Sequence, residues 1–249
     1  MLKYQDPEAY YENYWQSSFF GSKEPNKDEQ YRGNIILRFI EKYVVSSKGD
    51  EPGIKILDLG CGRGWLTNVL ARYGNVIGID PVRAAIMRAR ELHPSLSFHN
   101  GTAEDMLLKG GACQFDLIVS SEVIEHVVDD QKKNMMSSIY SLLKAGGFAI
   151  LTTPRGEVWN DWKRVYTKEQ PVEQWITESN LEELCRSVGF RVIDKDRIFI
   201  PWVSFNLMTR IATSRVFRRL MRYFPRSRML SWLRYHCGLY QVIVLKRPL

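Results

Sequence analysis

Short apolar runs alternate with amphipathic stretches over most of the chain. Seven runs read as strands, because they are apolar, rich in branched and aromatic side chains, and bounded by polar or glycine residues. They cover residues 54–59, 76–80, 96–99, 115–120, 148–153, 190–200 and 240–246. The first five are separated by stretches with helical spacing, which predicts the α/β class: a doubly wound, Rossmann-like, mostly parallel sheet of seven strands.

Three alternating glycines follow the first predicted strand, in ILDLGCGRG (56–64). They are Gly60, Gly62 and Gly64. Glycine adopts positive φ without strain and leaves the main chain bare for a ligand, and the amides that open the next helix face the same turn. This predicts a nucleotide-binding loop, although a glycine-rich turn alone is a weak signal because such turns also serve as plain connectors.

A carboxylate ends the second predicted strand, 16 residues after Gly64. This residue, Asp80, is expected at the carboxyl end of a parallel strand, where it can accept hydrogen bonds from two ribose hydroxyls. The alternative is a helix cap ahead of Pro81. Combined with the glycine loop, the carboxylate favours a nucleoside ligand. The GxGxG spacing and the early acid disfavour a dinucleotide dehydrogenase, which more often shows GxGxxG and an acid about 20 residues on.

Five segments in order give the chain a resemblance to the class I S-adenosylmethionine-dependent methyltransferases. The segments are ILDLGCGRG, VIGID, GTAEDM, FDLIVSSEVIEHV and LLKAGGFAILTTP. The resemblance covers about residues 32–245. Within the family, the motifs are most similar to those of ubiquinone-type O-methyltransferases, through SEVIEH (121–126) and the spacing of Tyr31 and Arg32 before the first strand. It implies a Rossmann-like enzyme that uses S-adenosylmethionine as its cofactor.

The resemblance also implies which residues bind the cofactor. They are Arg32, Asp58, Gly60, Cys61, Gly62, Gly64, Asp80, Thr102, Ala103 and Ser121. Asp80 is expected to bind the ribose, Thr102 and Ala103 to lie beside the adenine, and Ser121 to lie near the sulfonium. Arg32 is expected to pair with the methionine carboxylate, and the alternative is a solvated arginine on a helix.

Three polar residues of SEVIEH are the candidate catalytic groups: Glu122, Glu125 and His126. Their i, i+3, i+4 spacing puts them on one face if a helix has begun there. In one interpretation His126 is a general base, oriented by either glutamate. In a second, the three bind a divalent ion such as Mg²⁺, as similar sets do in ubiquinone-type and small-RNA 3′-end methyltransferases. In a third, the glutamates cap a helix and His126 only packs nearby.

The acceptor is predicted less sharply than the donor. The small-RNA enzymes carry a further histidine, whereas this chain has none between His126 and His236, so we expect a small-molecule acceptor, most readily a hydroxyl. An N-methyltransferase acting on a small amine and an inactive cofactor-binding partner subunit stay open. Trp159 and Trp162, after the fifth strand, either stack on the acceptor or pack within the domain. The four cysteines form no CxxC pair and no secretory leader precedes them, which predicts reduced thiols in a cytoplasmic protein.

Charge is concentrated near the end of the chain. Residues 201–239 hold eight arginines and no Asp or Glu, which accounts for the whole formal net charge of +7. Apolar residues recur there at helical spacing, so we expect basic amphipathic helices broken at Pro225. Four roles are open: a substrate lid with solvated arginines, contact with a membrane surface or lipid-like substrate, a site for an anionic acceptor, and, least favoured, nucleic-acid binding.

These features together predict the organisation of the chain. We expect one methyltransferase domain over 1–249. Its parts are an N-terminal helical lid at 1–47, a cofactor-binding core at 48–200 and 240–249, and the arginine-rich helical insertion at 201–239. A helical layer that merely caps the sheet is the alternative to the lid. After the fifth strand, Thr177 can cap a helix that runs to Val188 and ends at Gly189.

Overall fold

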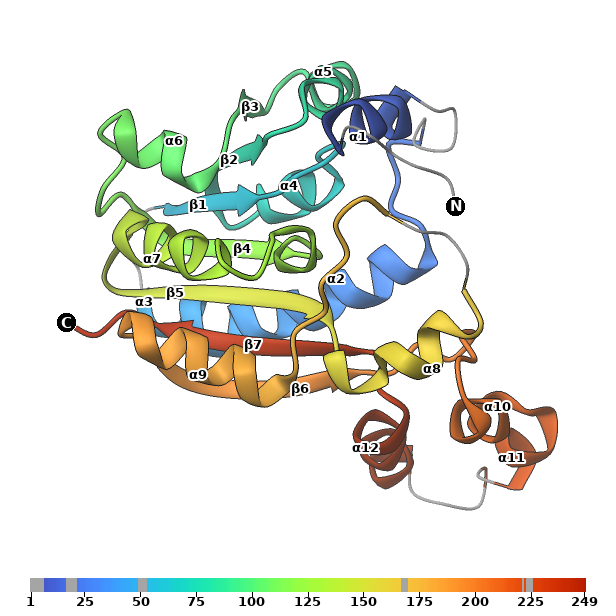
Figure 1. The fold of residues 1–249 in the computed structure, drawn as a ribbon. Coiled ribbons are helices and arrows are strands. Elements are labelled where there is room, and N and C mark those ends of the chain that lie inside the picture. Colours follow the sequence, from blue (N-terminus) through green and yellow to red (C-terminus); the bar gives the residue numbers. More distant parts are fainter. Residues whose placement is uncertain (1–6, 17–21, 49–52, 167–169, 221, 223–225) are drawn as a thin grey trace.

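The computed structural model describes residues 7–16, 22–48, 53–166, 170–220, 222 and 226–249. Seven strands form one sheet in the order β3-β2-β1-β4-β5-β7-β6 (Figure 1). The strands are β1 (Ile54–Leu59), β2 (Gly74–Asp80), β3 (Ser97–Asn100), β4 (Phe115–Ser121), β5 (Leu143–Pro154), β6 (Arg191–Ile198) and β7 (Tyr240–Lys246). The first five run parallel, whereas β7 is antiparallel to both of its neighbours, β5 and β6. This confirms the predicted doubly wound α/β sheet.

Helices cover both faces of this sheet (Figure 1). Before β5 they are α1 (Pro7–Gln16), α2 (Lys27–Phe39), the π-helix η2 (Ile40–Val45), α3 (Ser46–Lys48), α4 (Trp65–Leu70), α5 (Arg83–Leu92), α6 (Ala103–Leu108), the short 3-10 helix η3 (Ile124–His126) and α7 (Lys132–Leu142). After it come the 3-10 helix η4 (Gly156–Val158), α8 (Trp159–Lys163), α9 (Glu178–Val188), α10 (Leu207–Thr213), α11 (Arg215–Leu220) and α12 (Arg226–Cys237). No helix among the described residues is long and apolar enough to span a membrane.

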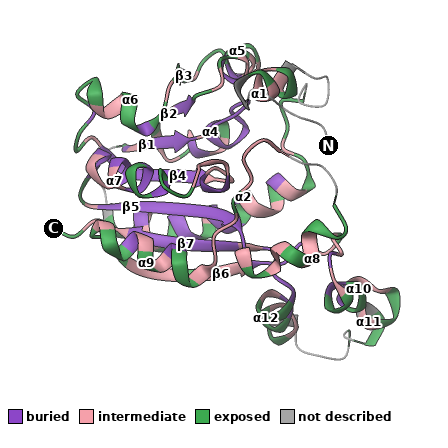
Figure 2. Ribbon diagram, viewed as in Figure 1, coloured by how far each residue is buried: buried purple, intermediate pink, exposed green. Residues whose placement is uncertain are grey.

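Two hydrophobic cores lie on opposite faces of the sheet. Successive side chains of a strand point to opposite faces, so in β1 Ile56 joins the core with α2, η2 and α4, while Leu57 joins the core with α6, α7 and α9. Strands buried on both faces appear in the sequence as continuous apolar runs. Figure 2 shows the central strands buried and the outer helix surfaces exposed.

Most predicted element boundaries agree with the structure. β1 and β7 have the predicted bounds, and α9 is capped by the Thr177 side chain and ends at Gly189, whose φ is 108°. β5 begins five residues earlier than predicted, and α4 ends at Leu70 rather than near residue 73. The predicted basic segment forms α10, α11 and α12, while the expected break at Pro225 lies outside the described residues.

Candidate active site

A cavity of about 440 Å³ lies at the carboxyl ends of β1, β2 and β4. Nine predicted site residues line it: Arg32, Gly60, Cys61, Gly62, Asp80, Ser121, Glu122, Glu125 and His126. Four others are absent from its lining: Asp58, Gly64, Thr102 and Ala103. Parallel strands bring these segments together, because their carboxyl ends meet at one edge of the sheet.

The loop after β1 has a conformation that requires glycine. Gly60, Gly62 and Gly64 have φ values of 74°, 52° and 82°, all in the left-handed region. The amides of Gly60 and Cys61 donate to the Ile79 carbonyl at 2.8 and 3.0 Å, which ties the loop to β2. A Cβ atom on Gly60 would lie 2.3 Å from the Val123 side chain, and one on Gly62 would lie 2.6 Å from the Trp15 ring. The bare backbone is therefore needed both for its dihedral angles and for the space around it.

Asp80 joins the end of β2 to the glycine loop. Its carboxylate accepts hydrogen bonds from the Gly62 amide at 3.0 Å and the Val82 amide at 2.9 Å. The N-cap residue of α5 is Val82, so the helix-cap interpretation of Asp80 does not describe this structure. Burial raises the pKa of Asp80 to about 6, because the low-dielectric surroundings disfavour its charged form. A cavity-lining carboxyl with a raised pKa holds its proton more tightly than an exposed aspartate does.

Three of the residues outside the cavity lining have evident structural contacts. Asp58 is 1% exposed and accepts a hydrogen bond from the Thr67 hydroxyl at 2.6 Å, which fastens α4 to β1. Burial raises the pKa of Asp58 to about 7. Thr102 caps α6, accepting from the Asp105 amide in a capping box, and Ala103 is buried in the core formed with α7 and α9.

The SEVIEH segment does not form the helix that its spacing suggested. Glu122 has a φ of 59°, and η3 begins only at Ile124, so the expected i, i+3, i+4 face is wrong. Glu122 accepts a hydrogen bond from the Thr152 hydroxyl at 3.0 Å, and Glu125 accepts one from Thr153 at 2.9 Å. Neither glutamate caps η3. A tight turn, together with β5, holds both carboxyl groups at the cavity.

Burial raises the pKa of both Glu122 and Glu125, which favours their neutral forms. The cationic Arg32 guanidinium opposes this shift without cancelling it. Arg32 donates from Nε to the Ser121 hydroxyl at 3.1 Å, and its guanidinium lies 5.5 Å from the centre of the Tyr240 ring. Arg32 is thus a cavity residue and not a solvated helix arginine.

His126 is held by groups other than the two glutamates. Its Nδ1 lies 3.0 Å from the Val172 carbonyl oxygen and 3.2 Å from the Tyr11 hydroxyl. A carbonyl only accepts hydrogen bonds, so the bond to Val172 requires the proton on Nδ1 and leaves the Nε2 lone pair free in the neutral ring. Within the described part of the chain, Nε2 has no hydrogen-bond partner. The expectation that Glu122 or Glu125 orients this ring is therefore wrong.

Aromatic residues from distant segments complete the wall, and the sequence analysis did not assign them to the site. Tyr11, Tyr14 and Trp15 come from α1, while Trp175 and Tyr240 follow β5 in the chain. The predicted lid at 1–47 includes the first three, although it did not name them as site residues. Of the two tryptophans singled out after β5, Trp162 lines the cavity. It stacks on Tyr166, with ring centres 3.8 Å apart, and Trp159 lies 4.9 Å from Trp175, so the indoles also pack within the domain.

Comparison with known proteins supplies the family. The profile of a family described as a methyltransferase domain matches residues 28–195. The chain belongs to this methyltransferase family. An uncharacterized methyltransferase of Synechocystis sp. is 32% identical over 150 residues, with 58% of this chain and 70% of the relative covered. A ubiquinone biosynthesis O-methyltransferase of Ruegeria sp. is 36% identical over 174 residues, with 62% and 68% covered.

The extent of these matches differs among relatives. The chain spans about two thirds of the bacterial ones, but the match covers only 31% of the ubiquinone biosynthesis O-methyltransferase of rat mitochondria. Among solved structures, a SAM-dependent methyltransferase from Archaeoglobus fulgidus has a TM-score of 0.60 at 17% identity, with 88% of this chain and 97% of that chain covered. This likeness supports the fold. The protein is thus a SAM-dependent methyltransferase of class I.

The methyltransferase cavity fits its cofactor. Gly60 and Gly62 have no side chains and line the cavity with their main chain, and the Asp80 carboxylate faces the same space. A divalent ion fits less well. Among the described residues, no three His, Cys, Asp or Glu side chains are arranged to hold a metal ion, and Glu122 and Glu125 each bond a threonine hydroxyl instead. The described residues therefore do not form a preassembled Mg²⁺ site.

Proposed function

We propose that this methyltransferase transfers the methyl group of S-adenosylmethionine to a hydroxyl oxygen of a small-molecule acceptor, with His126 as the general base. One observation carries the proposal. Nδ1 of His126 donates to the Val172 carbonyl, which leaves the Nε2 lone pair free to accept a proton, and the ring lines the same cavity as the glycine loop. The Ruegeria relative is a ubiquinone biosynthesis O-methyltransferase, which supports an oxygen acceptor.

Cofactor binding is assigned to the loop and its surroundings. Asp80 binds the ribose hydroxyls, and the main chain of Gly60 and Gly62 lines the space for the rest of the molecule. Arg32 binds the methionine carboxylate, and Ser121, which Arg32 holds at 3.1 Å, lies near the sulfonium. Cys61 lines the same loop. Gly64 shapes the turn and Asp58 supports it from behind.

Thr102 and Ala103 are assigned to the adenine by the family resemblance, and neither residue lines the cavity. The lid role of residues 1–47 is better supported. Tyr11, Tyr14 and Trp15 of α1 line the cavity, and the Trp15 ring packs against Gly62 of the loop. Side chains from this helix can therefore exclude water from the methyl group during transfer.

The chemistry requires little beyond positioning and one proton transfer. S-adenosylmethionine, when bound, supplies a methyl group activated by a sulfonium. With S-adenosylmethionine bound, Nε2 of His126 would take the hydroxyl proton as the acceptor oxygen bonds to the methyl carbon, and the electron pair of the carbon–sulfur bond would pass to sulfur. Burial raises the pKa of both Glu122 and Glu125, and in their neutral forms these groups can donate hydrogen bonds to a polar acceptor. The aromatic rings in the wall favour a lipid-like acceptor.

A panel of phenols, aliphatic alcohols and amines, assayed for methyl transfer with and without a chelator, tests the proposal. We expect turnover on a hydroxyl acceptor that the chelator does not abolish. His126→Ala should lower kcat roughly 10²- to 10⁴-fold while the Kd for the cofactor stays unchanged. Unchanged turnover in this variant would show that His126 is not the base. Turnover on amines alone would favour N-methylation, and cofactor binding without any turnover would favour an inactive partner subunit.

A further inference from the structure

The arginine-rich insertion, residues 201–239, exposes an unusual amount of apolar surface. Eight large apolar side chains in it are at least 38% exposed: Trp202, Leu207, Met208, Ile211, Val216, Leu220, Trp232 and Tyr235. Leu207 and Val216 reach 71% and 70%. Figure 2 shows α10 and α11 mainly as exposed and intermediate ribbon, projecting from the body of the protein. Apolar side chains that face outward from helices in this way are typical of a surface that is covered in use.

Positive charge surrounds these side chains. The exposed arginines with described side chains are Arg210, Arg215, Arg219, Arg222 and Arg228. No ion pair neutralises any of these five within the described part of the chain, and the insertion contains no Asp or Glu. Arg234 differs, since it pairs with Asp196 of β6 at 2.7 Å. The charge is therefore available to a partner outside the chain.

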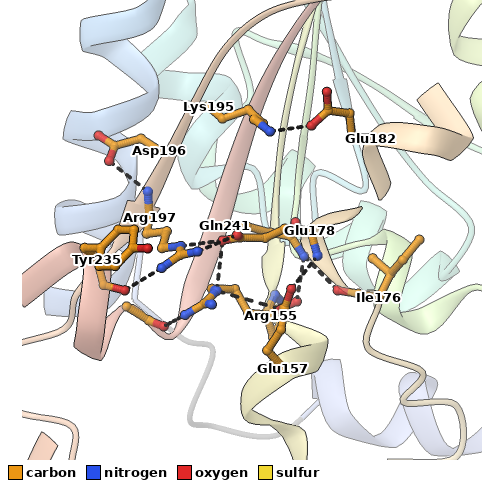
Figure 3. A network of polar contacts seen from close by, with 12 residues as sticks. Arg155, Glu157, Ile176, Glu178, Glu182, Lys195, Asp196, Arg197, Tyr235 and Gln241 are labelled. Carbon is orange, nitrogen blue, oxygen red and sulfur yellow. Dashed lines mark hydrogen bonds and ion pairs between the residues drawn. The ribbon is translucent and has the colours of Figure 1, made fainter. Parts of the chain in front are cut away.

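The insertion is attached firmly to the sheet. Figure 3 shows the polar network at its base, in which Arg197 of β6 bonds both carboxylate oxygens of Glu178 at 2.6 and 2.7 Å and also the Tyr235 carbonyl of α12. Arg155 donates to the Gly238 carbonyl at 2.9 Å. A small core of its own, with Phe199, Ala212, Leu233 and Cys237, lies beneath the helices. The exposed surface is thus part of a folded platform.

This platform adjoins the active-site cavity. Asn206, which caps α10, donates to Asp161 of α8 at 3.1 Å, and the Phe205 ring lies 6.4 Å from that of Trp162, a cavity residue. Trp202 donates to Asp28 of α2 and contacts the Tyr31 ring. A surface that binds the platform therefore lies next to the α8 wall of the cavity.

We propose that residues 201–239 dock this methyltransferase on an anionic membrane surface. Leu, Ile, Val and Trp side chains enter the boundary between headgroups and acyl chains, while the arginines contact lipid phosphates. Charge complementarity selects an anionic surface, and the aliphatic residues select a bilayer over nucleic acid, whose recognition uses phosphate contacts and base stacking. Docking would bring the cavity close to acceptors dissolved in the membrane. Only this consequence for the acceptor rests on the proposed function.

Co-sedimentation of the full chain with vesicles tests the docking. At low salt we expect binding to phosphatidylcholine vesicles that contain about 30% phosphatidylglycerol, and weak binding to vesicles of phosphatidylcholine alone. The triple variant Arg215→Gln, Arg219→Gln, Arg222→Gln should lose roughly 100-fold in partition coefficient, because each basic side chain contributes about a factor of five near an anionic surface. A matched control removes three exposed charges elsewhere: Lys109→Gln, Lys133→Gln, Arg191→Gln. It should lose less than about 3-fold.

A second variant tests the apolar contact. Leu207→Ser, Val216→Ser, Leu220→Ser should weaken vesicle binding by roughly 10-fold or more, whereas the control pair Met87→Ser, Leu108→Ser, exposed on other helices, should not. Absent vesicle binding at low salt, or equal losses in the arginine triple and its control, would overturn the proposal. So would tighter binding to single-stranded RNA that survives the serine triple. Cofactor affinity, measured on every variant, keeps a failure of docking distinct from a failure of the methyltransferase assignment.

Discussion

Replacing the ribose-binding carboxylate should change both the strength and the pH dependence of cofactor binding. Asp80→Asn removes the negative charge while keeping the shape of the side chain, so the bonds to the Gly62 and Val82 amides are retained in part. Hydrogen bonds to a charged group contribute about 1.5–3 kcal/mol, so the Kd for S-adenosylhomocysteine should rise roughly 10- to 150-fold. Isothermal titration calorimetry at pH 7 measures this directly.

The pH dependence follows from the raised pKa of Asp80. Only the ionised form accepts both ribose hydrogen bonds, and protonation competes with the ligand below a pKa of about 6. The Kd of the wild-type protein should therefore be roughly 10-fold higher at pH 5 than at pH 7, whereas a carboxyl with its ordinary pKa of 3.8 would weaken binding by less than about 10%.

Asp80→Asn should show no such step, and Asp130→Asn, which removes an exposed charge outside the cavity, should retain it. A step that persists in Asp80→Asn would mean that another group, with buried Asp58 the first candidate, controls cofactor affinity, and the assignment of Asp80 would be wrong.

Two further changes probe the wall and the loop. Tyr11→Phe removes the hydroxyl that lies 3.2 Å from Nδ1 of His126. Losing one hydrogen bond of about 1 kcal/mol should lower kcat roughly 5-fold and shift the pH profile of kcat. Tyr140→Phe, which is outside the cavity, should leave both unchanged. Gly60→Ala should lower Tm by more than the matched variant Gly53→Ala. Both positions have positive φ, but only at Gly60 does a Cβ atom meet a side chain, at 2.3 Å, which adds about 1–3 kcal/mol of overpacking.

Opposite results would be informative for each change. If Tyr11→Phe altered only KM, the hydroxyl would contact the acceptor and not hold the histidine. If the two glycine variants had the same Tm, strain from positive φ would account for the whole decrease in Tm. The close contact with Val123 would then be relieved by a small movement. Circular dichroism and thermal melting of each variant measure the fold independently of activity.

The strands were predictable because each is buried on both faces and so forms an unbroken apolar run. β1 and β7 have the predicted bounds for this reason. The start of β5 was missed, since Leu143 precedes the polar and glycine residues KAGG, which interrupt the apolar signal although the chain stays extended. Helix ends were less certain for a similar reason: α4 stops at Leu70 with apolar side chains still following it.

The site residues that lie within one short sequence motif were predictable. Those that only the tertiary fold brings to the site were not. The glycine loop, Asp80 and SEVIEH each sit at the end of a strand, and the parallel sheet collects strand ends. Tyr11 and Val172 contact His126 from 115 and 46 residues away, a pairing that no local pattern encodes. The helical spacing of Glu122 misled because a residue with positive φ interrupts the backbone before η3.

The insertion connects two strands that are neighbours in the sheet. β6 and β7 are antiparallel and adjacent, and Ile198 is the register partner of Tyr240, so the chain leaves and re-enters the sheet at one rung of a hairpin. Because a two- to five-residue turn suffices to join such strands, their pairing does not require a connection of this length. Its length and composition can diverge between relatives while the cofactor pocket stays the same. This connection is therefore a position at which a methyltransferase core can gain a new binding surface.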